Sequence, residues 1–289
     1  MTAEKTMTVG RPSVWNSSSR RSLWIKSILS ILFALIWAFP VVWLVLSSFK
    51  PGSELFSYPL TFFPKQGTLA NYRLAFSRFN ILRYTYNTAY ITVFATVITI
   101  LMSCMCGFAL AKYSYRWTKV FFMCMLATTM LPTEIIMSPS FTVIYKLGLY
   151  NSLWGCIIPT VGTLTGVFLM RQFFISVPNE LLEAARIDGA NEGTIFFRIM
   201  MPLCKPQIAI LAIFSFRWRW NDYIWPLLTL HAKEKYTLQL ALRTLSGAES
   251  VDWATLLASS VLTMIPVVIV FIIFNKQIMS TNVASGVKG

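Results

Sequence analysis

The sequence predicts an all-α, polytopic membrane protein with six transmembrane helices. Composition and the grouping of apolar residues carry this prediction. Of the 289 residues, 56% are hydrophobic and only 12% are charged, whereas soluble domains carry about a quarter charged residues. Because a helix needs about 20 mostly apolar residues to cross the bilayer core, we expect spans at 28–46, 84–111, 120–145, 147–170, 206–230 and 254–275.

Charged residues occur in two of these blocks. The third block contains Glu134, and the fifth contains Arg217, Arg219 and Asp222. Charged side chains are costly within the bilayer and usually face the bundle interior or water. At about 100° per residue, Arg217 and Arg219 point to nearly opposite sides of their helix, so both cannot line one pathway. Arg219 lies three residues before Asp222, a spacing that also allows an ion pair.

The distribution of Lys and Arg predicts the orientation in the membrane. Six spans place both termini on the same side, and basic residues gather in the N-terminal segment, near 112–119 and in the connection 171–205. Because basic residues favour the cytoplasmic side, we place these segments there, although 49–83 on the opposite side is also basic. We predict a cytoplasmic N-terminal tail at 1–23, a six-helix transmembrane domain at 24–276 and a cytoplasmic C-terminal tail at 277–289.

Two classes of partner are excluded by the pattern of charged and metal-ligating residues. The net charge of +14 comes without a dense basic stripe and interleaved aromatic residues outside the apolar blocks, so we expect no nucleic-acid partner. The five cysteines lie in or beside apolar blocks without metal-ligand spacing, which is typical of packing residues. His231 is the only histidine. We therefore expect no metal site.

The connection at 177–202 predicts a helix–turn–helix elbow. Pro178 suits the first turn of a helix, and Glu180 and Glu183 suit its positive end. Gly189 is a natural stop because glycine accepts positive φ, and Asn191 is a good N-cap for a second short helix. Such an elbow is either a surface helix pair lying along the membrane or a docking lever for a cytoplasmic partner.

A resemblance favours the docking lever. The elbow is similar to the EAA loop of ABC importer permeases, and the residues that carry the similarity are Glu183, Ala184, Ala185, Gly189, Ile199, Met201 and Pro202. Met201 departs from the leucine of the family pattern. Further segments at 147–152, 220–227 and 286–289 resemble the smaller permease of sugar importers of the maltose-transporter type, and the resemblance runs from about residue 28 to the end of the chain.

The resemblance implies a type I ABC importer permease in the lipid of a bacterial inner membrane. It implies a second similar permease, two ATPase subunits that bind ATP and Mg, and an extracytoplasmic solute-binding protein. The chain itself has no G-x-x-x-x-G-K-[ST] phosphate loop, so we expect neither a cofactor in this chain nor an enzyme activity of its own.

Two sets of residues are expected to contact the ATPase subunits. The coupling set in the elbow is Glu183, Ala184, Ala185, Arg186, Asp188 and Gly189. The second set forms the C-terminal tail, Gly286, Val287, Lys288 and Gly289, which is expected to reach between the ATPase subunits. The alternative for the tail is a frayed terminus.

The fifth span is the expected site of solute contact. Counted from Lys205 at 1.5 Å per residue, Arg217 lies roughly 18 Å into a core about 30 Å thick. The resemblance implies a carbohydrate solute, mostly an oligosaccharide, and the arginines at 217 and 219 suit an acidic one. The candidate pathway residues are Glu134, Arg217, Trp220, Asn221 and Tyr223. Alternatively, Asn221 and Asp222 only hold helices together, as polar residues in spans also do.

Two other functions remain open at this point. One is a permease of a glycerol-phosphate-type ABC importer. The other is a stand-alone secondary carrier, which predicts an internal repeat and paired carboxylates near the middle of the membrane. Glu134 and Asp222 are the only carboxylates within the predicted spans, and no convincing repeat is present. Co-purification of an ATPase separates the importer from the carrier.

Overall fold

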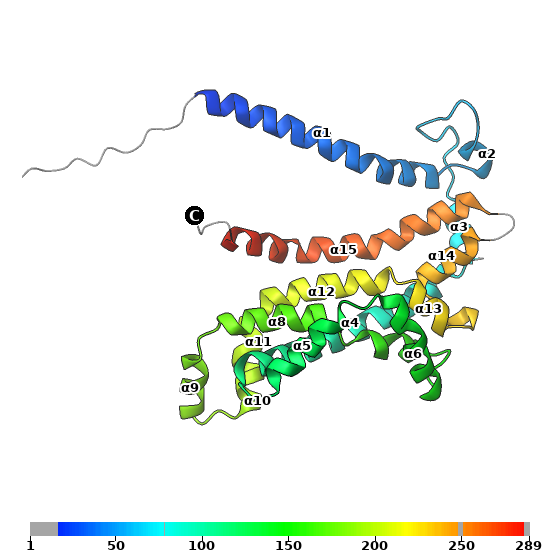
Figure 1. Ribbon diagram of the computed structural model, residues 1–289. Helices are drawn as coiled ribbons and strands as arrows, with labels where there is room; N and C mark the ends of the chain where they lie inside the picture. Colours follow the sequence, from blue (N-terminus) through cyan, green and yellow to red (C-terminus); the bar gives the residue numbers. More distant parts are fainter. Residues whose placement is uncertain (1–16, 78, 248–250, 286–289) are drawn as a thin grey trace, which may run out of the picture.

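The computed structural model describes residues 17–77, 79–247 and 251–285, which contain helices and no strand (Figure 1). The α-helices are α1 (Ser17–Ser48), α2 (Gly52–Leu55), α3 (Ala70–Ser77), α4 (Ile81–Lys112), α5 (Thr118–Thr128), α6 (Thr133–Lys146), α7 (Leu153–Ile157), α8 (Leu164–Ser176), α9 (Glu180–Ile187), α10 (Glu192–Thr194), α11 (Met201–Leu203), α12 (Lys205–Trp220), α13 (Ile224–Thr229), α14 (Leu238–Ser246) and α15 (Trp253–Ser285). Short 3₁₀ segments lie at η1 (Ile158–Thr160) and η3 (Lys233–Lys235), and a π-helical segment lies at η2 (Ile195–Met200).

Six spans are present when bent helix pairs are counted as one span each. Three unbroken helical stretches are long and apolar enough to cross a membrane, at Ser22–Ser48, Ile81–Lys112 and Trp253–Phe274. Three further spans are pairs of helical pieces that meet at 107° (α5 with α6), 43° (Leu153–Thr160 with α8) and 77° (Glu192–Leu203 with α12). The predicted six-span, all-α fold is therefore confirmed, with the difference that half of the spans are broken.

The third span shows the largest departure from a straight helix. Pro132 accounts for the break between α5 and α6, because proline has no N–H and disfavours helical backbone in the residue before it. The Thr128 hydroxyl donates to the Met125 carbonyl at 2.7 Å, and the Thr129 hydroxyl donates to the Leu126 carbonyl at 2.6 Å. These bonds give the carbonyls of the last turn of α5 hydroxyl donors beside the break. With 11 residues, α5 rises only about 16 Å.

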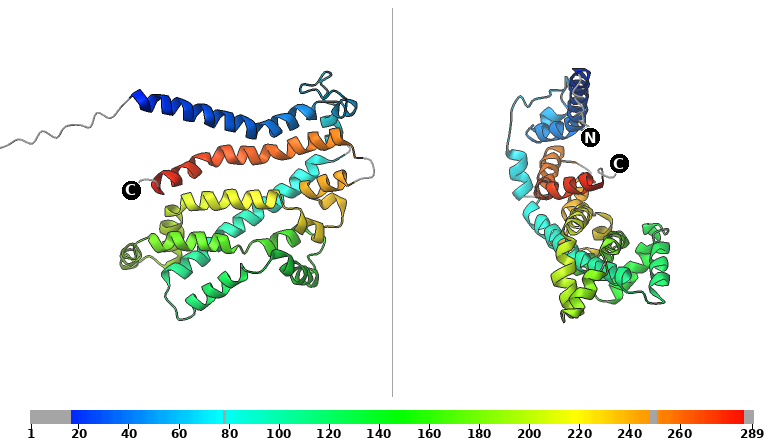
Figure 2. Two further views of the ribbon diagram at one scale, coloured as in Figure 1. Left: turned by 45° about the horizontal axis from the view of Figure 1, so that its top comes forward. Right: turned by 90° about the vertical axis from the view of Figure 1, so that its left-hand side faces the viewer.

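The central helix is α4, which packs along α8 and α12 (Figure 2). Gly107 permits the close approach of α4 and α8. A Cβ atom at this position would lie 2.7 Å from the Cβ of Met170 and 2.9 Å from the backbone nitrogen of Arg171. Small residues at such contacts let membrane helices approach closely and gain van der Waals contact. The α4–α8 contact thus depends on the absence of a side chain at Gly107.

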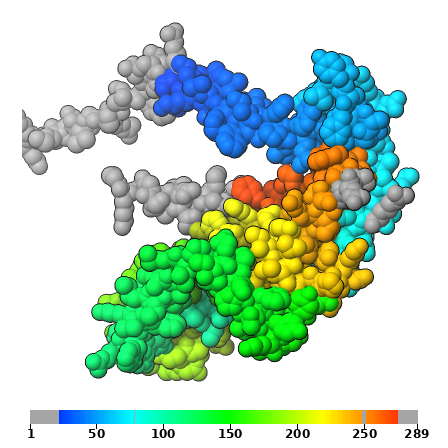
Figure 3. Space-filling model, turned by 45° about the vertical axis from the view of Figure 1, so that its right-hand side comes forward, coloured from blue at the N-terminus to red at the C-terminus, as the bar shows by residue number. Residues whose placement is uncertain are grey.

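Helix α1 contacts α15 and lies on its outer side, away from the remaining spans (Figures 1 and 3). Its last turn is anchored, since Ser48 is buried and its carbonyl accepts a 2.8 Å hydrogen bond from the Asn71 amide. Elsewhere, no residue of its most apolar 18-residue window is buried, and Trp24 and Trp37 are each 69% exposed. Helix α1 therefore presents a long apolar surface that the described part of the chain leaves uncovered.

Candidate functional site

The elbow between α8 and α12 has the predicted helix–turn–helix form. Helix α9 ends at Ile187, and Gly189 follows with φ +79°, a backbone conformation that glycine adopts without strain. The Asn191 side chain accepts a 2.8 Å hydrogen bond from the backbone N–H of Thr194 and caps the second helical stretch. Each of these features was expected from the sequence.

One face of the elbow packs on the spans. Leu182 and Ala185 from α9, and Phe196 from η2, join one buried cluster with Phe108 of α4 and Phe174 of α8. Ala185 is 7% exposed, so within the predicted coupling set it is a packing residue and fixes α9 against the membrane domain. Because this interface resembles a protein core, a force on the elbow is transmitted to α4 and α8.

The opposite face of the elbow is exposed. The predicted coupling residues on this face are Glu183, Ala184, Asp188 and Gly189. Sequence reasoning missed Ile187, which is 86% exposed beside them. The signal was present, because Ile187 falls outside the stripe of α9 that carries Leu182 and Ala185. Ile187 is therefore a large apolar side chain exposed among polar ones at the tip of the elbow.

An ion pair closes the elbow. The Arg186 Nε lies 2.9 Å from the Glu192 carboxylate, the only ion pair among the described residues. The Tyr113 hydroxyl donates a second hydrogen bond to this carboxylate. Both partners are exposed, so the pair adds little stability. The pair nevertheless connects α9 to α10 through Arg186, which is another predicted coupling residue. The predicted tail contact at 286–289 lies outside the described residues and stays a prediction.

Arg219 lies in the interior of the bundle. It is 7% exposed, and its guanidinium donates to the Ser215 hydroxyl at 2.6 Å, to the Thr99 hydroxyl at 2.7 Å and to the Thr160 carbonyl. Thr99 donates in turn to the Val161 carbonyl at 3.0 Å. These two carbonyls lie at the break between η1 and α8, so Arg219 and Thr99 together satisfy backbone groups that the broken span leaves unpaired.

The ion pair with Asp222 that the sequence spacing allowed is not formed, since no carboxylate of the described residues lies within 4 Å of Arg219. Instead, Asp222 accepts a 3.3 Å hydrogen bond from the backbone N–H of Trp225 at the start of α13. Arg219 is therefore a structural cation that joins α12, α4 and the break before α8.

We expect Arg219→Met to destabilise the protein strongly. The substitution removes the donors to Ser215, Thr99 and Thr160, and each buried polar group left without a partner costs about 1–3 kcal/mol. The thermal unfolding midpoint in detergent, followed by tryptophan fluorescence, measures this loss. Arg217→Met is the matched control, because Arg217 is exposed. An equal decrease for both variants would contradict the structural role of Arg219.

The predicted pathway residues occupy different environments. Trp220 is 2% exposed and its indole N–H donates to the Thr263 carbonyl at 3.1 Å, which makes it part of the core. Tyr223 is half-buried, whereas Arg217 and Asn221 are exposed. Glu134 is exposed in the first turn of α6 and is not ion-paired with a described residue. Arg217 is exposed and Arg219 is buried, as expected of two side chains that point to opposite sides of one helix.

Asn221 lies at the rim of a partly polar cleft of about 310 Å³ between α12, α14 and α15. Its side-chain oxygen accepts a 3.2 Å hydrogen bond from Gln239 of α14, and Ser260 and Thr263 of α15 also line the cleft. Sequence reasoning missed Gln239, because nothing in the sequence placed α14 beside the end of α12. The cleft provides amide and hydroxyl groups of the kind that bind sugar hydroxyls.

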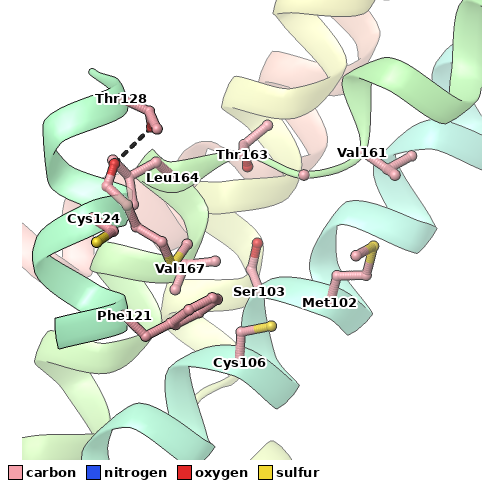
Figure 4. A pocket seen from close by; sticks show the side chains of 12 residues that line it. Met102, Ser103, Cys106, Phe121, Cys124, Thr128, Val161, Thr163, Leu164 and Val167 are labelled. Carbon is pink, nitrogen blue, oxygen red and sulfur yellow. Dashed lines mark hydrogen bonds between the residues drawn. The ribbon is translucent and has the colours of Figure 1, made fainter. Parts of the chain in front are cut away.

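A second cleft, of about 390 Å³, lies between α4, α5 and the loop before α8 (Figure 4). Cys106 and Cys124 line it with mainly apolar neighbours. The cysteines of the described residues are all free, and no cluster of metal-ligating side chains occurs among those residues. Cys104, Cys156 and Cys204 are buried in apolar clusters, as expected of packing residues, whereas Cys124 is exposed.

Comparisons with known proteins agree with this architecture. The family model "Binding-protein-dependent transport system inner membrane component" matches residues 100–280, more than half of the chain. The arabinooligosaccharides transport system permease protein of Halalkalibacterium halodurans is 37% identical over 270 residues, which cover 92% of this chain and 96% of the relative. The diacetylchitobiose uptake system permease protein of Streptomyces coelicolor is 31% identical over 266 residues, 91% of this chain and 88% of the relative.

A solved structure is similar over nearly the same length. One chain in the crystal structure of a bacterial ABC transporter involved in the import of the acidic polysaccharide alginate superposes with a TM-score of 0.80 at 26% identity, covering 91% of this chain and 98% of that chain. The family is a transport family and not a class of enzymes. From the matched family model, the relatives and the fold together, the chain belongs to the binding-protein-dependent transport system inner membrane components and is an ABC importer permease.

Proposed function

We propose that this permease forms, with a second similar permease, the translocation pathway for an oligosaccharide that carries acidic groups. Two partner ATPase subunits bind Mg and ATP and hydrolyse it, and an extracytoplasmic binding protein delivers the solute. The observation that carries the proposal is the exposed elbow tip around Ile187, which is joined through a buried cluster to α4 and α8.

The elbow is the ATPase contact in this proposal. Glu183, Asp188 and Gly189 are exposed within four residues of the apolar side chain of Ile187, and in this proposal they form with it a small patch that fits a cleft on a globular partner. Closure of the ATPase dimer on ATP moves the two elbows together. Because α9 packs rigidly on the spans, this motion biases the pathway between its inward-open and outward-open states.

The second permease covers helix α1. The described part of the chain covers only a small part of the apolar surface of α1. A neighbouring bundle of membrane helices buries such a surface by close packing. In this assembly both termini lie in the cytoplasm, on the same side as the elbow. The tail at 286–289 then reaches the ATPase subunits.

The proposed solute follows from Arg217 and the relatives. Arabinooligosaccharides, diacetylchitobiose and alginate appear in the names of similar proteins, which supports a carbohydrate. Arg217 is an exposed cation within a predicted span, and such a charge is retained where it faces water or a ligand. A carboxylate on the sugar is the group that Arg217 would bind, with Asn221 and Gln239 as neutral partners for hydroxyl groups.

We expect Arg217→Gln to reduce uptake of an oligouronate by roughly tenfold or more, since a hydrogen bond to a charged group contributes about 1.5–3 kcal/mol. Uptake of a neutral oligosaccharide should change less than about twofold. The measurement uses proteoliposomes with the complete complex, and Arg217→Lys is the control that keeps the charge.

Other outcomes for Arg217→Gln would contradict the proposal. Equal losses of uptake for both sugars would show that Arg217 does not recognise an acidic group. No loss for either sugar would remove Arg217 from the pathway. If glycerol phosphodiesters inhibit uptake and no sugar does, the glycerol-phosphate-type importer is favoured instead.

A further inference from the structure

A basic cleft lies at the elbow end of the membrane domain and has no part in the proposed solute pathway. Its volume is about 480 Å³, and it lies where α4 ends, α5 begins and α8 approaches the elbow. Four of its lining residues are cations, and none is acidic. The four cations are Lys112, Arg116, Lys119 and Arg171.

The positive charge of this cleft is not neutralised within the described residues. None of the four cations has a carboxylate of those residues within 4 Å. Glu180 acts on Lys112 through space, but it does not line the cleft. Lys112 donates instead to neutral acceptors, the Val177 carbonyl and the Asn179 side chain at 2.8 Å. The cleft therefore keeps a surplus of about four positive charges.

Arg171 lines this cleft and lies against an aromatic ring. Its guanidinium carbon lies 4.2 Å from the centre of the Phe122 ring, which fixes the plane of the group. Its Nε is buried and has no hydrogen-bond partner within the described part of the chain. Buried donors are normally satisfied by protein, water or ligand. An arginine held by a ring beside three other cations is suited to an anion with several oxygen acceptors.

The surroundings of the cleft indicate the source of that anion. Tyr115 lines the cleft, and Trp117 follows the lining residue Arg116 in the chain. The two aromatic residues are 70% and 72% exposed, as expected at the membrane interface. The next turn of α5 carries Val120 and Phe121, which are 50% and 57% exposed and are suited to contact acyl chains. Basic pockets between membrane helices on the cytoplasmic side bind anionic lipid headgroups.

We propose that this cleft binds the phosphate headgroup of an anionic phospholipid, with the acyl chains along α5. Lys112 joins the cleft to the first residues of the elbow through Val177 and Asn179. A bound headgroup therefore lies against the hinge between α8 and α9.

The test measures the thermal unfolding midpoint of the full chain in neutral detergent during titration with lipid. Phosphatidylglycerol should raise the midpoint, and phosphatidylcholine should not. The double substitution Arg116→Gln with Lys119→Gln should weaken the apparent affinity for phosphatidylglycerol on the order of tenfold. The matched control removes two exposed cations elsewhere, by Arg73→Gln with Lys146→Gln, and should leave the affinity unchanged.

Three results would overturn the proposal. Equal effects of the two lipids would remove the preference for a negative headgroup. Stabilisation by inorganic phosphate alone, equal to that by phosphatidylglycerol, would identify a site for a free anion. If the cleft instead binds an ATPase subunit, the double variant would lose the ATPase on purification of the complex and retain its full response to phosphatidylglycerol.

Discussion

Replacing Ile187 by aspartate is expected to abolish the association of the permease with its ATPase. Ile187 is 86% exposed at the elbow tip, so the substitution removes no core contact from the isolated chain. In the proposed complex the side chain enters an apolar cleft, where a carboxylate would be buried without a partner. Truncation of such anchors typically costs about 2 kcal/mol or more, and a buried charge costs more.

The measurement for Ile187 is the amount of ATPase subunit retained on the tagged permease, together with ATP turnover in the presence of the loaded binding protein. We expect a loss of more than about thirtyfold in affinity. Ile187→Leu is the conservative control and should retain both properties. The thermal midpoint of the isolated chain should be the same for all three proteins. Retention of normal coupling by the aspartate variant would remove the elbow tip from the ATPase contact.

Replacing Gly107 by leucine is expected to prevent stable packing of α4 on α8. Even a Cβ atom at this position would lie 2.7 Å from the Met170 Cβ and 2.9 Å from the Arg171 nitrogen. Because one of these is a backbone atom, the helices must separate. Overpacking of a close contact costs about 1–3 kcal/mol and occasionally more, and here the displacement would also open the cluster of Phe108 and Phe174 that supports the elbow.

The yield of monodisperse protein and its thermal midpoint measure the effect at Gly107. Gly162→Leu is the matched control, because no atom lies within 4 Å of a Cβ built there and its φ is not in the left-handed region. We expect the Gly107 variant to aggregate or to unfold at a much lower temperature than the Gly162 variant. Comparable stability of the two would show that the α4–α8 contact adjusts without cost.

Much of the fold followed from local sequence signals. The apolar blocks predicted the six spans, and the glycine and asparagine at 189 and 191 predicted where the elbow turns, because backbone conformation and capping depend on neighbouring residues. The opposite directions of Arg217 and Arg219 followed from helical geometry alone.

The features that sequence reasoning did not provide depend on contacts between distant segments. Pro132 accounts for a break between α5 and α6, but the 107° bend depends on how α6 packs after the break. The partners of Arg219 come from positions 120 and 59 residues away, Thr99 and Thr160, whereas local spacing pointed only to the nearby Asp222. Burial of Ala185 and Trp220 likewise became visible only once α9 and α12 were packed against their neighbours.

The most direct test of the central claim is purification of the tagged chain from its native membrane in mild detergent, followed by an assay of ATP hydrolysis with the solute-loaded binding protein. We expect an ATPase to co-elute, its turnover to rise several-fold on addition of the loaded binding protein, and Ile187→Asp to lose both. A chain that purifies without an ATPase, and that still moves solute into vesicles free of ATP, would contradict the claim.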